Sequence, residues 1–305
     1  MKLYKAYRSV SWKILLKYLP TNKETQSGTL KRKREEYMQF RKIYDINNFD
    51  FHFHENERKI IKLISYDVPR TQPDYPLFHI DPIQKMLARI LFIWNSRHPA
   101  SGYVQGINDI TTPFIVVFLN DVIDIDFESF KTPEKILDLV PEEKFDEIEA
   151  DTYWCLSKIM DSILDNYTDS QPGTVKALQK IKEITRKMDV DLSNHLLEND
   201  VDLTQFAFRW VFCLLIREFS LKMGLRLFDT YISEDSGFSI LHIYICSAMI
   251  LKFGSKIKKM NNNEIMTFLQ TLPTKSWKED DLKVLIAEAY VYKSIFEKTQ
   301  GHLKV

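Results

Sequence analysis

The sequence has 305 residues, 45% of them apolar and 28% charged, which is ordinary for a globular protein large enough to bury a sizeable core. The formal net charge is zero, which excludes a global field that would draw the chain to nucleic acid or acidic lipid. Eight glycines and eleven prolines are few for this length, so long helices are favoured over short strands.

The charges are unevenly distributed along the chain. Residues 1–34 carry ten Lys/Arg against one acid, and residues 121–151 carry twelve Asp/Glu against three bases. The run Lys31–Arg34 is compatible with a nuclear-import or polyanion patch. Acidic residues and an apolar series follow it directly, however, so we interpret it as a solvated helix face.

Three widely separated cysteines, Cys155, Cys213 and Cys246, each lie in an apolar run without a CxxC pair. This pattern predicts buried free thiols in a reducing compartment. We expect no signal peptide, because residues 1–19 alternate basic and apolar positions, and no apolar stretch approaches the roughly 18 residues of a membrane span. The sequence therefore predicts a soluble, cytoplasmic protein.

Helical spacing of apolar residues runs through most of the chain. It is clearest over residues 81–96, where Asp81 and Pro82 begin the element and Pro99 follows it. The same spacing predicts further helices over residues 146–166, 174–187, 190–199, 203–217, 220–232, 238–256, 263–271 and 279–298. The predicted fold class is all-α.

The helical pattern breaks at Asp169–Gly173, where the sequence reads Asp-Ser-Gln-Pro-Gly. A break of this length indicates a hinge between lobes that share an interface, and not a flexible linker. We therefore predict one domain over 1–305, with an N-terminal lobe over 1–168 that carries the catalytic loops and a C-terminal lobe over 169–305.

Two other segments interrupt the helices. Residues 68–80 are rich in proline, which predicts an extended, stiff loop. Residues 101–106 place Gly102 and Gly106 around Gln105, which predicts a turn with unusual dihedral angles or close approach to a partner.

The two segments can meet in space. The helix over 81–96 spans about 24 Å at ~1.5 Å per residue, and a loop of this length reaches up to roughly 40 Å. The loop can run back along the helix, so we expect Arg70 to come near Gln105.

Motifs for self-contained chemistry are missing. There is no phosphate-binding GxxxxGK[ST] loop, no dinucleotide fingerprint and no GxSxG elbow. Ser101 near His98 lacks an oxyanion-turn signature, and His52 with His54 lacks a third metal ligand. We expect no metal site, no cofactor of the chain's own and no independent hydrolase site.

Three short motifs occur in order along the chain. Arg8–Trp12 reads RxxxW, Ile64–Arg70 reads IxxDxxR and Ser101–Gln105 reads SGxxQ. With these motifs the chain resembles the TBC-domain Rab GTPase-activating proteins over nearly its whole length, and most of all a Golgi-associated fungal branch and its animal counterparts. The resemblance extends through residues 97–109, 149–155, 206–210 and 227–231.

The resemblance implies a V-shaped pair of helical lobes and a role as GTPase activator. Arg70 matches the family's arginine finger, whose permanently charged planar fork neutralises charge developing on the transferring phosphoryl group. Gln105 matches the glutamine that orients the attacking water. The implied partner is a GTP-bound Rab, which brings GTP and Mg²⁺ and provides an indirect link to Golgi or vesicle membranes.

The resemblance also suggests supporting residues. Asp67 can orient the Arg70 loop through a charge-assisted hydrogen bond, and Gly102 and Gly106 can let the backbone approach the nucleotide. Arg8 and Trp12 lie on one helix face. We expect Trp12 to pack beneath the catalytic loops and Arg8 to pair with an acid or a carbonyl.

The sequence departs from the family in two places. Seven residues precede Arg8 where family members carry a lead-in segment, and Phe228 stands where a tryptophan is frequent. Two other functions compete with the activator. One is a catalytically silent Rab-binding scaffold or adaptor, which intact Arg70 and Gln105 disfavour; the other is an α-solenoid adaptor, which the lack of a repeat disfavours.

Overall fold

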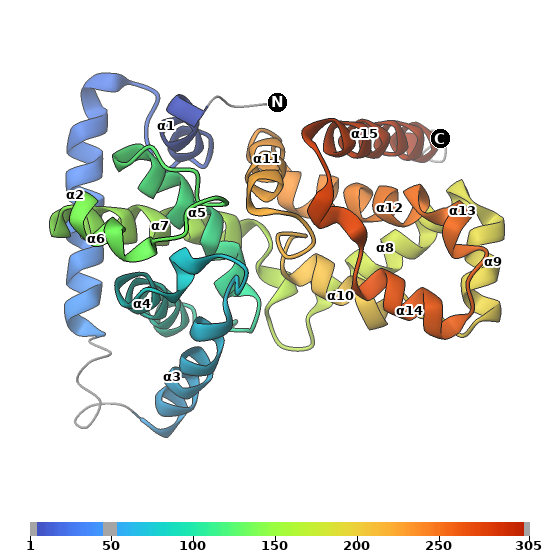
Figure 1. Ribbon diagram of the computed structural model, residues 1–305, viewed down its shortest axis with the longest axis horizontal. Coiled ribbons are helices and arrows are strands. Elements are labelled where there is room, and N and C mark those ends of the chain that lie inside the picture. Colours follow the sequence, from blue (N-terminus) through green and yellow to red (C-terminus); the bar gives the residue numbers. More distant parts are fainter. Residues whose placement is uncertain (1–4, 45–53, 302–305) are drawn as a thin grey trace. The chain divides into compact units, whose positions relative to one another are not determined.

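The computed structural model describes residues 5–44 and 54–301 (Figure 1). Within these ranges the regular structure is helical and no β-strand occurs, which confirms the all-α prediction. The chain divides into two compact units, Met1–Asp169 and Ser170–Val305, and the division falls at the interruption noted in the sequence.

The first unit contains seven helices and four short 3-10 turns among its described residues. The helices are α1 (Lys5–Leu15), α2 (Lys23–Ile43), α3 (Glu55–Asp67), α4 (Asp81–Arg97), α5 (Ile107–Val122), α6 (Ile136–Leu139) and α7 (Glu142–Ser162). The turns are η1 (Val68–Arg70), η2 (Pro76–His79), η3 (Pro133–Lys135) and η4 (Leu164–Asn166).

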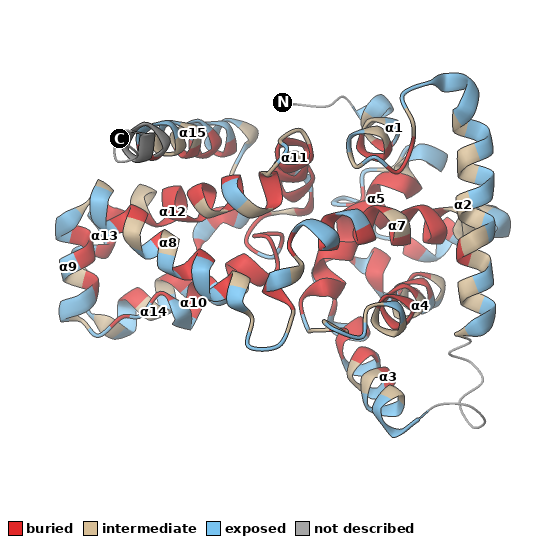
Figure 2. Ribbon diagram, turned by 180° about the vertical axis from the view of Figure 1, so that it is seen from behind, coloured by how far each residue is buried: buried red, intermediate tan, exposed pale blue. Residues whose placement is uncertain are grey.

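Helix α5 forms the centre of the first unit. Its residues from Ile107 through Leu119 are buried, and it packs against α1, α4 and α7 (Figure 2). From α1, Trp12 is fully buried and meets the Phe114 ring edge-on at 5.5 Å between centroids. This packing fixes the helix that begins directly after Gly106.

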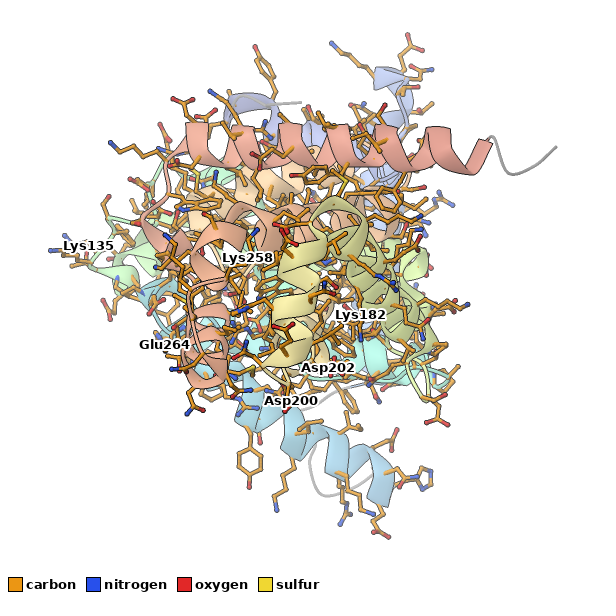
Figure 3. The ribbon with its side chains drawn as sticks, turned by 90° about the vertical axis from the view of Figure 1, so that its right-hand side faces the viewer. Lys135, Lys182, Asp200, Asp202, Lys258 and Glu264 are labelled. Carbon is orange, nitrogen blue, oxygen red and sulfur yellow. The ribbon has the colours of Figure 1, made fainter. Side chains whose placement is uncertain are left out.

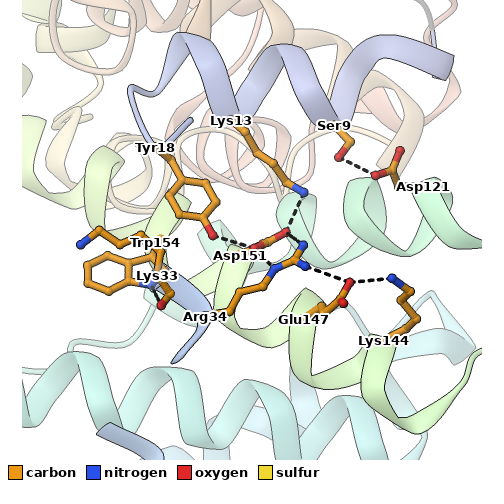
Figure 4. A network of polar contacts seen from close by, with 10 residues as sticks. All are labelled: Ser9, Lys13, Tyr18, Lys33, Arg34, Asp121, Lys144, Glu147, Asp151 and Trp154. Carbon is orange, nitrogen blue, oxygen red and sulfur yellow. Dashed lines mark hydrogen bonds and ion pairs between the residues drawn. The ribbon is translucent and has the colours of Figure 1, made fainter. Parts of the chain in front are cut away.

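Salt bridges join the basic N-terminal segment to the acidic middle of the chain. Arg34 on α2 donates hydrogen bonds of 3.0 and 2.8 Å to the two carboxylate oxygens of Asp151 on α7 (Figure 4). Lys13 Nζ lies 2.6 Å from the same carboxylate, and the Tyr18 hydroxyl donates to it at 2.7 Å. Part of the basic block and part of the acidic block are therefore paired inside one unit.

These contacts divide the basic run of residues 31–34. Lys31 and Arg32 are exposed, as predicted for a solvated face. The prediction is wrong for Arg34, which is committed to Asp151, and for Lys33, whose ammonium pairs with Glu36 at 2.9 Å. The helical periodicity could not reveal this difference, because the acidic partner of Arg34 lies 117 residues away.

The second unit contains eight helices and two short turns among its described residues. The helices are α8 (Pro172–Met188), α9 (Val190–Glu198), α10 (Thr204–Phe212), α11 (Leu221–Ile232), α12 (His242–Lys252), α13 (Gly254–Ile257), α14 (Asn262–Gln270) and α15 (Glu279–Gly301). The turns are η5 (Gly237–Leu241), a π-helical turn, and η6 (Pro273–Ser276). Helix α12 packs against α8, α10 and α15 and forms the centre.

Two predicted helices of this unit are interrupted. The helix expected over 203–217 ends at Phe212, because Leu214 and Leu215 take left-handed backbone angles, φ 49° and 60°. The element expected over 238–256 starts as a π-helical turn and breaks after Lys252. Apolar periodicity continues across both breaks, so the sequence pattern did not reveal them.

The predicted core is confirmed with one exception. Trp94, Trp210 and Tyr231 are fully buried, and the three cysteines are buried and free. Trp154 is half-buried instead: its indole N–H donates to the Lys33 carbonyl at 2.8 Å, and the Lys33 ammonium lies over its ring.

Charges of both signs share the end of the second unit formed by α9, α13 and α14 (Figure 3). Lys182, Lys258, Asp200, Asp202 and Glu264 are all exposed there. Lys258 is itself paired with Asp189 at 3.0 Å. This end presents no surface of a single charge. No helix in the described part of the chain is long and apolar enough to cross a bilayer.

Candidate functional site

The segment that carries Arg70 is a compact turn and not the extended loop predicted from its prolines. Helix α3 ends at Asp67, and η1 follows it directly, with Pro69 inside the turn. Proline fits the start of a 3-10 turn, where its missing N–H is not needed. The Thr71 hydroxyl then donates to the Asp67 carbonyl at 2.9 Å, which closes the turn around Arg70.

The segment that carries Gln105 connects α4 to α5. Gly102 has φ 65° and donates its N–H to the His98 carbonyl at 2.8 Å. The Asn95 side chain accepts the Tyr103 N–H at 2.9 Å, and a β-carbon on Gly102 would lie 3.1 Å from that same oxygen. Gly106, with φ 113°, then leads into α5. Both positions therefore require glycine for the turn itself.

Two pairs of side chains tie these segments together. The Tyr103 hydroxyl donates to Asp67 at 2.7 Å, and the Asn108 amide donates to the Thr71 hydroxyl at 2.9 Å. Asn108 also accepts the Gly106 N–H at 2.9 Å. The structure thus brings together the two loops of the IxxDxxR and SGxxQ motifs, as expected, but residues 68–80 do so as short turns and not as the extended loop from which the expectation was argued.

The Arg70 guanidinium is anchored on one side and open on the other. Its Nε donates to Asp67 Oδ1 at 3.0 Å and its Nη2 contacts the same oxygen, while 58% of the side chain is exposed. Asp67 is fully buried and receives both Arg70 and Tyr103. Burial and the neighbouring Asp67 carboxylate raise the pKa of Tyr103, so its hydroxyl stays a donor.

Gln105 is the exposed residue of its loop. Its side chain forms no hydrogen bond with any residue that the structure describes. The flanking Tyr103 and Gly106 are buried, so the backbone is held while the carboxamide remains available. The Gln105 carboxamide, on a loop joined to the one that carries Arg70, can therefore contact a ligand that approaches from solvent.

The RxxxW residues lie on α1, away from these two turns in sequence but in the same unit. Trp12 packs on Phe114, two turns along α5 from Gly106, and so supports the helix that follows the Gln105 loop. Arg8 is half-buried on the same helix. Their neighbour Ser9 donates to Asp121 near the end of α5 at 3.1 Å.

Sequence reasoning missed the residues that join the loops. Tyr103 and Asn108 form the cross-loop contacts, and Asn95 and Thr71 complete them. The position of Tyr103 between two glycines was the available signal, because an aromatic side chain in a tight turn needs a place to pack. Nothing local indicated that Asp67 would be its partner.

The discarded alternatives gain no support from the geometry. The Ser101 hydroxyl points to the His98 carbonyl at 3.4 Å, and His98 contacts the Trp94 carbonyl through Nδ1, at 2.9 Å. Among the described residues no group of three His, Cys, Asp or Glu could hold a metal ion. His52 lies outside the described residues, and the His54 N–H bonds Glu57 at 2.8 Å.

Fold and site together define a helical domain that presents an arginine and a glutamine from two interlocked turns. The model of the Rab-GTPase-TBC domain matches residues 5–258, most of the chain. The chain therefore belongs to the Rab-GTPase-TBC domain family.

Fungal and animal proteins are similar to the chain at comparable levels. It is 43% identical over 306 residues to GTPase-activating protein gyp1 of Schizosaccharomyces pombe, covering 98% of this chain and 57% of that protein. It is 42% identical over 298 residues to human TBC1 domain family member 22B, covering 97% and 57%. The chain thus spans somewhat more than half the length of these relatives, whose distribution agrees with the predicted fungal branch and its animal counterparts.

A solved structure has the same fold. The crystal structure of the Ypt/Rab-GAP domain of Gyp1p aligns with a TM-score of 0.86 and 39% identity, covering 96% of this chain and 90% of that one. The all-helical architecture is therefore the architecture of this family.

Proposed function

We propose that this chain accelerates GTP hydrolysis by a Rab-family small GTPase, with Arg70 as an arginine finger and Gln105 as a glutamine finger. The observation that carries the proposal is the pair of interlocked turns, which leaves both side chains accessible while holding their backbones. Family membership and the name of the S. pombe relative support the same activity.

The chemistry assigned to Arg70 is electrostatic. Charge builds up on the transferring phosphoryl oxygens in the transition state, and an arginine supplied in trans accelerates hydrolysis by about 10³–10⁵-fold. Asp67 holds one edge of the guanidinium, so Arg70 needs less ordering when the partner binds. The exposed remainder of the fork is free to meet the γ-phosphate.

The chemistry assigned to Gln105 is orientation of the attacking water. A carboxamide can accept one hydrogen bond from the water and donate another, whereas lysine only donates and an ionised glutamate only accepts. Tyr103 and Asn108 fix the turn on which Gln105 sits. GTP and Mg²⁺ come with the partner in this scheme, and the Rab provides the indirect link to Golgi or vesicle membranes.

Single-turnover hydrolysis by a panel of GTP-loaded Rab proteins tests the proposal. The wild type accelerates at least one of them, and Arg70→Ala lowers the rate by about 10²-fold or more with binding largely kept. Arg70→Lys retains the charge but loses the planar fork, so most of the rate loss remains. Gln105→Ala also lowers the rate.

Two outcomes would contradict parts of this assignment. A wild-type protein that binds Rab without accelerating any of them is a silent scaffold. Full activity in Gln105→Ala alongside an inactive Arg70→Ala variant would remove Gln105 from the mechanism and leave the arginine finger alone.

A further inference from the structure

The junction of α1 and α2 forms an open pocket of about 460 Å³ on the first unit. Its polar lining comprises the three cations Lys17, Arg32 and Lys33 and the hydroxyl groups of Thr21 and Thr29, whereas the Tyr18 hydroxyl is already used as a donor to Asp151. None of the described residues that line it carries a carboxylate. The pocket therefore combines positive charge with hydroxyl groups, which can donate hydrogen bonds to a phosphate.

A neighbouring groove on the other side of α2 shows that the excess of positive charge is confined to the pocket. That groove, of about 750 Å³, is lined by Lys31, Arg34 and Lys42 together with the carboxylates Glu35, Glu143, Asp146 and Glu147. Its acidic groups outnumber its cations. The two sides of one helix thus have opposite charge balance.

Nearby acids do not cancel the pocket's charge. Asp151, which accepts the Tyr18 hydroxyl, is buried and already forms salt bridges with Lys13 and Arg34 (Figure 4). Glu36 is matched by Lys33. This leaves two cations in excess, since neither Lys17 nor Arg32 forms an ion pair with a carboxylate of the described residues.

Lys17, which lines the pocket, has a left-handed backbone conformation. Lys17 has φ 58°, and the Tyr18 and Lys17 N–H groups bond the carbonyls of Lys13 and Ile14 at 3.0 and 2.9 Å. This is the helix-ending arrangement in which glycine is preferred at the left-handed position. A lysine there sacrifices stability, and such strain is commonly retained at functional sites.

We propose that the pocket of Lys17, Arg32 and Lys33 binds a compact ligand that carries more than one phosphate group. Its volume lies in the range of small-molecule sites, roughly 300–1,000 Å³. Two unmatched cations together with hydroxyl groups suit a phosphorylated sugar or inositol better than a single carboxylate. A lipid headgroup of this kind would add a direct membrane contact to the one made through the Rab.

Binding of soluble inositol trisphosphate to the whole chain, measured by calorimetry, tests the site. We expect Lys17→Ala and Arg32→Ala each to weaken binding about fivefold, the effect of one cation near a cluster of negative charge. Lys31→Ala is the matched control, because it removes the same charge from the adjacent residue but lies in the acidic groove. It should leave binding unchanged.

Lys17→Gly separates binding from folding. Glycine relieves the left-handed strain, so the melting temperature should hold or rise while binding falls about fivefold, as in Lys17→Ala. A purely structural role for Lys17 would instead leave binding of the phosphorylated probe unaltered.

Vesicle sedimentation identifies the source of the phosphate. Phosphatidylcholine vesicles with phosphatidylinositol monophosphate should recruit the chain, and soluble inositol trisphosphate should compete, if the ligand is a lipid headgroup. Binding of the soluble probe without recruitment indicates a free phosphate ester. The proposal fails if the probe does not bind, or if Lys31→Ala loses as much affinity as Arg32→Ala, because diffuse charge would then explain the result.

Discussion

The hydroxyl of Tyr103 offers a sharp test of the interlocked turns. Tyr103→Phe removes the donor to Asp67 at 2.7 Å but keeps the ring, so no cavity forms and neither Arg70 nor Gln105 is altered. A hydrogen bond to a charged, buried group contributes about 1.5–3 kcal/mol. If that whole loss fell on the transition state, hydrolysis would slow by roughly 10–150-fold at ~1.36 kcal/mol per decade.

Part of this free energy will be lost from the stability of the free protein, because Asp67 and Tyr103 are in contact before any partner binds. We therefore expect about a tenfold fall in Rab activation together with a melting temperature lower by a few degrees, at about 2–4 °C per kcal/mol for a unit of this size. Single-turnover hydrolysis and a thermal melt measure the two effects.

Tyr18→Phe is the matched control for this experiment. It removes a hydroxyl that donates to the buried carboxylate of Asp151, also at 2.7 Å and in the same unit, away from the two turns. Both variants should lose similar stability, and Tyr103→Phe alone should lose activation. Equal activation in the two variants would refute the view that the Tyr103–Asp67 contact positions Arg70.

Further predictions concern the charged and buried groups of each unit. Arg34→Ala leaves Asp151 with Lys13 and Tyr18, so we expect the free energy of unfolding in urea to fall by an amount at the lower end of the ~3–5 kcal/mol typical of breaking a buried pair. The control Arg32→Ala, at an exposed residue, should change that free energy by less than ~0.5 kcal/mol. Equal losses in the two variants would contradict the Arg34–Asp151 assignment. Burial alone would raise the pKa of Asp151, but the Arg34 hydrogen bonds and the Lys13 charge hold it below its ordinary value. The stability that Asp151 contributes is therefore present above the unfolded-state pKa of about 4 and lost as the pH falls below it, and melting of Asp151→Asn should lack this step. Complete burial lowers the pKa of His242 to about 4. As the pH drops, the unfolded chain binds a proton at His242 before the folded chain does, so the free energy of unfolding falls by about 3 kcal/mol between pH ~6.5 and ~4. If the melting temperature of His242→Gln depends on pH as steeply as that of the wild type, His242 is excluded as the source of this loss.

Much of the fold could be predicted from the sequence, and so could the two residues that we propose as fingers. Apolar spacing located most helices of the second unit and α4 and α7 of the first, because a buried helix face must repeat at steps of three and four. Arg70 and Gln105 stand in short motifs whose order along the chain needs no structure to recognise. The charge of an arginine and the two-way hydrogen bonding of a carboxamide are properties of the residues themselves.

The tertiary structure decided what surrounds those residues. The Tyr103–Asp67 bond joins positions 36 residues apart, and the Arg34–Asp151 pair joins positions 117 residues apart. No local pattern encodes such contacts, because they depend on how whole helices pack. Packing also determines that the proline-rich residues 68–80 form two tight turns and not an extended loop. It likewise determines that the pockets on the two sides of α2 differ in charge. The sequence thus indicated which residue types are available for the proposed chemistry, and the packing of the helices determined which contacts hold them.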